Sequence, residues 1–123
     1  MRMSSDADAP FDAAFDLARA GDTDRLAALL AAGLPADHAN ESGDSLLMLA
    51  AYHGRADTVR ALIAAGADLD RCNDRQQSPL AGAVFKNSDE VIAVLLAAGA
   101  DPDAGTPSAR QTAAMLDRDT FTA

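Results

Sequence analysis

The chain has 123 residues, which is enough for one domain of ordinary size. Apolar residues make up 49% of it but aromatic residues only 4%, a composition that favours thin layers of closely packed helices over a globular core of large side chains. The net charge of −9, from 19 acids and 10 bases, argues against a nucleic-acid-binding protein and favours a protein partner with a basic patch.

The N-terminal part is predicted to contain a tail and one helix pair. Residues 1–10 lack the apolar stretch of a signal peptide and are expected to form a flexible tail, followed by a repeat domain over 11–123. The first repeat covers about 11–39. Its first helix is predicted to begin at an Asp12 cap and to end at Gly21, and its second helix to end at Gly33.

Two further repeats follow, at about 40–72 and 73–105. Ser45 and Ser78 stand in phase as predicted N-caps, because their hydroxyl oxygens can accept hydrogen bonds from the first free amide groups of a helix. Pro79 follows at the first helical position, where its missing N–H costs nothing. Gly54 ends the first helix of one repeat, and Asn87 replaces it in the next, since asparagine tolerates the left-handed conformation.

The second helices carry the strongest repeat signal. Their predicted C-terminal glycines are spaced by 33 residues and are Gly33, Gly66 and Gly99. Each is preceded by an apolar stripe with the spacing i, i+3, i+4, which begins at Leu26, Val59 and Ile92. Each stripe follows an acid in the first helical turn, where it meets the positive end of the helix dipole: Asp24, Asp57 and Glu90.

A partial repeat is predicted over 106–123. Thr112 is aligned with Ser78, so that the preceding loop is one residue longer than in the other repeats and a helix runs from about 113 to 118. This helix and the first one are interpreted as caps that are polar on the face without a neighbour.

These features resemble the ankyrin repeat, a unit of 33 residues made of a turn and two antiparallel helices. Residues 78–83 read Ser-Pro-Leu-Ala-Gly-Ala, close to the family's Thr-Pro-Leu-His-x-Ala, and residues 66–70 read Gly-Ala-Asp-Leu-Asp, close to its Gly-Ala-Asp-x-Asn. The resemblance covers about residues 11–121 and implies an all-α solenoid of three helix pairs and a C-terminal capping helix. The alanine-rich, lysine-poor composition also suggests a small bacterial member of the family.

No residue pattern indicates catalysis, so an enzyme is not expected, and neither is a cofactor. The phased carboxylates are interpreted as parts of turns and helix starts, and the serines as caps. His38, His53 and Cys72 match no known metal-ligand spacing, and no metal site is predicted. A single cysteine excludes an intrachain disulfide, and the longest apolar run is too short for a membrane span. We therefore expect a cytoplasmic monomer that binds neither nucleic acid nor membranes.

The resemblance implies that a partner protein binds in the concave groove and at the turn tips. In-phase aromatic residues, Tyr52 and Phe85, are predicted to form one apolar ledge there or, alternatively, to seal the stack. The other predicted contact residues lie at the ends of the first helices and in the turns: Arg19, His53, Lys86, Glu41, Ser42, Asp44, Asp74, Arg75 and Gln77. Two alternatives remain, an acidic immunity-type protein that neutralises a basic enzyme, and a component of a homo-oligomeric assembly.

Overall fold

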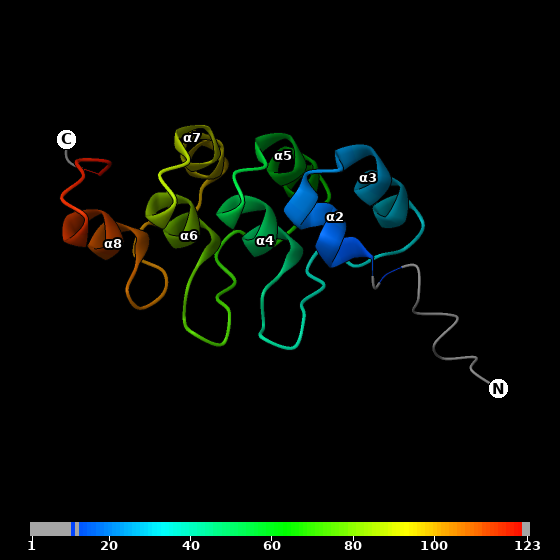
Figure 1. The fold of residues 1–123 in the computed structure, drawn as a ribbon, viewed down its shortest axis with the longest axis horizontal. Helices are drawn as coiled ribbons and strands as arrows, with labels where there is room; N and C mark the ends of the chain where they lie inside the picture. The colour runs from blue at the N-terminus through cyan, green and yellow to red at the C-terminus, as the bar shows by residue number, and fades with distance from the viewer. Residues whose placement is uncertain (1–10, 12, 122–123) are drawn as a thin grey trace.

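The computed structural model describes residues 11 and 13–121, so the predicted tail at 1–10 and the Asp12 cap lie outside the described part. The described helices form three antiparallel pairs and a closing single helix: α2 (Ala14–Ala20) with α3 (Thr23–Ala31), α4 (Leu46–Tyr52) with α5 (Ala56–Ala64), α6 (Pro79–Phe85) with α7 (Asp89–Ala98), and α8 (Ala109–Met115). Figure 1 shows the first helices in one row, the second helices in a parallel row, and the long turns projecting to one side. The predicted all-α solenoid is confirmed.

Serine caps begin the two middle first helices, as predicted. The hydroxyl oxygen of Ser45 accepts a hydrogen bond from the backbone N–H of Met48 at 3.0 Å, and that of Ser78 accepts one from Ala81 at 3.1 Å. Both serines are buried, so their hydroxyl groups satisfy amide groups that water cannot reach.

Left-handed residues end the helices at the predicted positions. The first helices are followed by Gly21, Gly54 and Asn87, with φ of 76°, 73° and 59°. Glycine adopts this conformation without strain, and asparagine is one of the few other residues that tolerate it. The three predicted glycines after the second helices also have positive φ: Gly33, Gly66 and Gly99.

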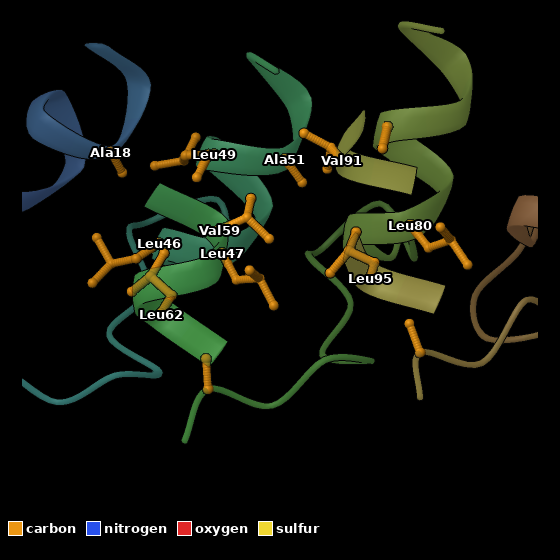
Figure 2. Packing of buried hydrophobic residues seen from close by; sticks show 14 of the residues in the cluster. Ala18, Leu46, Leu47, Leu49, Ala51, Val59, Leu62, Leu80, Val91 and Leu95 are labelled. Carbon is orange, nitrogen blue, oxygen red and sulfur yellow. The ribbon is translucent and has the colours of Figure 1, made fainter. Parts of the chain in front are cut away.

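The core consists largely of leucines that are buried at equivalent positions of successive repeats. Leu47 of α4 and Leu80 of α6 are fully buried, as are Leu62 and Leu95 of the second helices (Figure 2). All six residues 46–51 of α4 are buried, and so are residues 79–84 of α6, because each of these helices has a neighbour on both sides. The core is therefore continuous along the stack.

The turns are tied to each other by polar groups from neighbouring repeats. The carboxylate of Asp37 accepts a hydrogen bond from the backbone N–H of Asp68 at 2.7 Å, and Asp70 accepts one from Asp101 at 2.8 Å. Nearer the tips, the Asp74 N–H donates to the Ser42 carbonyl at 3.0 Å. These bonds fix the turns of successive repeats relative to each other.

The predicted start of the last helix is wrong. α8 begins after Ser108, not after Thr112, and Ser108 stands nine residues after Gly99, whereas Ser78 stands twelve after Gly66. The preceding loop is thus three residues shorter rather than one longer. Ser108 and Gln111 form a reciprocal capping box, with bonds of 2.8 and 3.1 Å, which fixes the start of the helix. Thr112 is instead buried inside the helix.

Candidate protein-binding groove

A hollow of about 410 Å³ lies between the first helices and the turns. It brings together seven of the eleven predicted contact residues, and adds two apolar residues of α4. The predicted members are Arg19, Asp44, Tyr52, His53, Arg75, Gln77 and Phe85, and the added ones are Met48 and Leu49.

Tyr52 and Phe85 form the predicted ledge. Their rings stack with centroids 6.4 Å apart and an interplanar angle of 10°. Phe85 is 51% exposed and Tyr52 half-buried, so the pair does not simply seal the stack but presents an aromatic surface to the solvent. The Nζ atom of Lys86 lies 5.0 Å from the Tyr52 ring centroid, in cation–π range.

A buried glycine allows the close approach that positions Tyr52. A Cβ atom at Gly82 would lie 2.6 Å from Cε of Met48 and 3.4 Å from Cδ1 of Tyr52. Without that atom, the side chains of α4 pack directly against the backbone of α6. The ledge is thus supported by the contact between these two helices.

Met115 extends the row, although the sequence analysis did not identify it. In the register set by Ser108, Met115 occupies the position in α8 that Phe85 occupies in α6 and Tyr52 in α4. It is 66% exposed and lines a second hollow of about 320 Å³ together with Phe85, Pro107 and Arg75. The wrong alignment of Thr112 concealed this match, and the Ser-x-x-Gln signature of the capping box at 108–111 is the signal that could have revealed it.

Cations gather where the first helices α2, α4 and α6 end. Arg19 pairs with Asp16 at 2.8 Å, and its carbonyl accepts a hydrogen bond from Nε of Arg55 at 2.8 Å. His53 makes an edge-on ring contact with Tyr52. Partial burial and the positive charges of Arg19, Arg55 and Lys86 lower the pKa of His53 below its usual 6.5. We name Arg19, Arg55 and Lys86, the three cations near His53, the cationic cluster.

The predicted acidic residues at the turn tips differ in solvent exposure and in hydrogen bonding. Glu41 and Asp74 are exposed, whereas Asp44 is half-buried and its carboxylate accepts a hydrogen bond from the side-chain amide of Asn73 at 2.8 Å. Asp44 therefore has a structural role in joining two turns. Ser42, also exposed, contributes its carbonyl to the tip contact described above.

A third hollow, of about 640 Å³, lies at the N-terminal end of the same side. Phe15 and His38 stack across it, with ring centroids 4.9 Å apart and an interplanar angle of 13°. The predicted contact residues Glu41 and Ser42 line it too. No sequence pattern pointed to Phe15, because the contact joins the first helix to a turn 23 residues away.

The groups considered for chemistry have structural partners. The phased carboxylate of Asp70 accepts a backbone hydrogen bond, as described above, and the carboxylates of Asp57 and Asp103 pair with Arg60 and Arg110. Burial and the nearby carboxylates of Asp70 and Asp68 raise the pKa of the Cys72 thiol, which disfavours the reactive thiolate. Within residues 11 and 13–121, three or more potential metal ligands do not come together anywhere.

Comparison with known proteins identifies the class of this repeat array. The profile of the family described as ankyrin repeats, in three copies, matches residues 14–106. The chain therefore belongs to the ankyrin repeat family, whose members typically act as non-catalytic modules for protein–protein interaction. None of the described helices has the length and apolar character needed to cross a bilayer.

A bacterial relative shares part of the sequence. The Pseudomonas aeruginosa protein named "Putative ankyrin repeat protein PA3287" is 62% identical to this chain over 42 residues. The match covers 34% of this chain and 25% of the relative. The chain thus spans well under two thirds of that protein's length.

Proposed function

We propose that this chain binds a partner protein through the concave groove and the turn tips, with the Tyr52–Phe85 pair as its apolar anchor, and without catalysis of its own. The observation that carries the proposal is the stacked pair itself, half-open to solvent above a hollow of about 410 Å³. Aromatic side chains held in this way are typical anchors of protein interfaces, since they bring large contact areas with little loss of entropy.

The rigidity of the groove supports this function. The turns are joined by hydrogen bonds between repeats, and α4 and α6 are buried on both sides. A surface that is already ordered loses little conformational entropy when a partner binds. The exposed acids Glu41 and Asp74 add a negative charge at the tips, which would face basic side chains of the partner there.

Capture of partners from lysate of the source cells tests the proposal. Phe85→Ala, alone and with Tyr52→Ala, is expected to abolish or strongly reduce the recovery of a specific protein, measured by quantitative mass spectrometry. Leu96→Ala is the matched control, because it truncates an apolar side chain that is 36% exposed but lies on α7, outside the groove. Circular dichroism checks that each variant is folded. Equal recovery with the folded double variant would remove this site.

A further inference from the structure

Some cationic side chains of this acidic protein form ion pairs with carboxylates of the same chain, and others do not. On the second helices they are neutralised: Arg25 pairs with Asp22 at 3.5 Å, and Arg60 pairs with both Asp57 and Glu90 at 2.8 and 2.9 Å. In the groove the opposite holds for two cations. Arg75, which lines the groove, and Lys86, which lies over the Tyr52 ring, have no carboxylate within ion-pair distance among the described residues. Arg19 also lines the groove, and it pairs with the exposed Asp16 at its outer side.

The unpaired cations lie beside the aromatic row. Arg75 lines both the hollow under Tyr52 and the hollow between Phe85 and Met115, while Lys86 lies over the Tyr52 ring. Among the described residues, Asp44 is the carboxylate that lines the first of these hollows, where it already accepts a hydrogen bond from Asn73, and the second hollow is lined by none. The groove is therefore locally cationic, although the whole chain carries −9.

The groove also changes in character along the stack. At the ends of α2, α4 and α6 stands the cationic cluster, whereas the end of α8 carries Met115 and Leu116, 66% and 39% exposed. Leu116 is the C-cap of α8, as Lys86 is of α6. Three of the four large apolar side chains that are exposed among the described residues thus gather at this end: Phe85, Met115 and Leu116.

We infer that the occupant of the groove is an acidic segment of a partner protein, whose carboxylates lie on Arg75 and Lys86 and whose large apolar side chain enters the hollow between Phe85 and Met115. The inference rests on the proposed function and names its partner class. Carboxylates supply the charge that the groove cations lack within the chain. A hollow of about 320 Å³ lined by Phe85, Met115 and Pro107 accepts an aromatic or branched aliphatic side chain.

A protein segment fits this surface better than a nucleic acid does. The apolar hollow adjoins the cations directly, and a protein segment supplies apolar side chains and carboxylates together. A polyanion several times longer than the groove would also meet the exposed acids of the tips, Glu41 and Asp74, and the net negative charge. A short acidic segment can lie in the groove without reaching the acids of the tips, and it carries less charge to be repelled by the chain as a whole.

Selection of peptides on the purified full chain tests this inference. A phage-displayed library of random twelve-residue peptides serves as the probe, and enriched peptides are synthesised and titrated by fluorescence anisotropy at two salt concentrations. We expect enrichment of Asp and Glu next to a large apolar residue. Binding is expected to weaken as salt rises, since exposed charges are screened.

Charge reversal identifies the contact. Arg75→Glu with Lys86→Glu is expected to weaken binding of the selected peptide by about tenfold or more. Arg25→Glu with Arg71→Glu is the matched control, because it makes the same change in net charge at exposed residues that line none of the groove hollows. We expect less than about a threefold change for the control. Phe85→Ala with Met115→Ala tests the apolar contact, and urea denaturation verifies that all variants fold.

The outcomes separate this inference from the proposed function. Enrichment of Lys- and Arg-rich peptides that still depend on Phe85 would overturn the inference and leave groove binding intact. The same holds for acidic peptides that are insensitive to the charge reversal. If no enriched peptide depends on the groove residues, both proposals fail. Tighter binding of a single-stranded oligonucleotide of twelve nucleotides, with the same sensitivity to charge reversal, would also overturn the inference.

Discussion

The middle helices α4 and α6 differ from α8 in how they use the same positions. Leu47 and Leu80 point into the stack, fully buried, whereas the corresponding residue of α8 is the exposed Arg110. Its Nε atom pairs with Asp103 at 2.9 Å, and its guanidinium group lies 5.5 Å from the ring centroid of Phe121. The middle helices thus join two neighbours, while α8 ends the described stack with a charged face.

The middle helices therefore contribute mainly to the stability of the fold, and the end of α8 contributes mainly to the exposed surface. In the middle of the stack, residues 46–51 and 79–84 of the first helices are buried, and the last residue of each helix, Tyr52 or Phe85, lines the groove without being buried. In α8 just three residues are buried, and both Met115 and Leu116 remain exposed. Changes in the middle should therefore affect the whole fold, and changes at the end should affect the surface.

Truncating an inward leucine of the middle repeats should give the largest effect. Leu80→Ala removes a fully buried side chain of a helix that packs between two others, and is expected to lower the free energy of unfolding by about 2–5 kcal/mol. Met115→Ala, at the exposed end, is expected to change it by less than ~0.5 kcal/mol. Urea denaturation followed by circular dichroism measures both. Similar losses for the two variants would contradict the comparison.

Removing a helix cap should show whether α8 opens independently. Ser78→Ala is expected to lower the free energy of global unfolding by about 1 kcal/mol, because α6 lies between two helices. Ser108→Ala also loses a cap, but its effect should appear as amide hydrogen exchange in α8 that is faster by about fivefold, with little change in global unfolding.

Ser88→Ala controls for the substitution itself. Ser88 precedes α7 but its side chain makes no capping hydrogen bond, so neither quantity should change appreciably. If Ser108→Ala lowered the global stability as much as Ser78→Ala does, α8 would unfold together with the middle repeats, and the distinction between the two regions would be lost.

Most of the fold could be predicted from the sequence because its signals repeat. Helix-ending glycines, serine caps and apolar stripes recur in phase, so each copy supports the alignment of the others, and the structure confirms them. The last helix was misplaced since only one copy of it exists and a single threonine was matched. The helix instead begins after Ser108, because the capping box of Ser108 and Gln111 satisfies two free backbone amide groups at once.

The groove was harder to predict than the helices. Phase alone placed Tyr52 beside Phe85, because equivalent residues of adjacent repeats lie next to each other. The net charge of −9, in contrast, says nothing about which cations lack partners. That property depends on contacts between residues far apart in sequence, such as Arg60 with Glu90, and such contacts become visible only in the structure.

The titration of His53 is expected to show the smallest of these effects. It tests whether the cations at the ends of the first helices act on the pKa of this residue. Its pKa in the folded protein is expected below 6.5, because burial and three nearby cations disfavour the imidazolium form. NMR titration of the ring protons measures this value. Lys86→Gln should raise the pKa only in part, since burial, the largest cause, and the two arginines remain. Arg25→Gln, on the second helix α3, should leave it unchanged.

The same shift links pH to stability. Between the lowered pKa of the folded state and the ordinary value of the unfolded state, the unfolded chain binds more protons at His53 than the folded protein does. The contribution of His53 is therefore fully present above pH 6.5 and is lost as the pH falls through that window. His53→Gln should remove this part of the pH dependence. The free energy of unfolding of the wild type should therefore fall relative to that of the variant as the pH is lowered from 7.5 to the folded pKa. A His53 pKa at or above its ordinary value would contradict an arrangement in which burial and the nearby charges of Arg19, Arg55 and Lys86 all disfavour the imidazolium form.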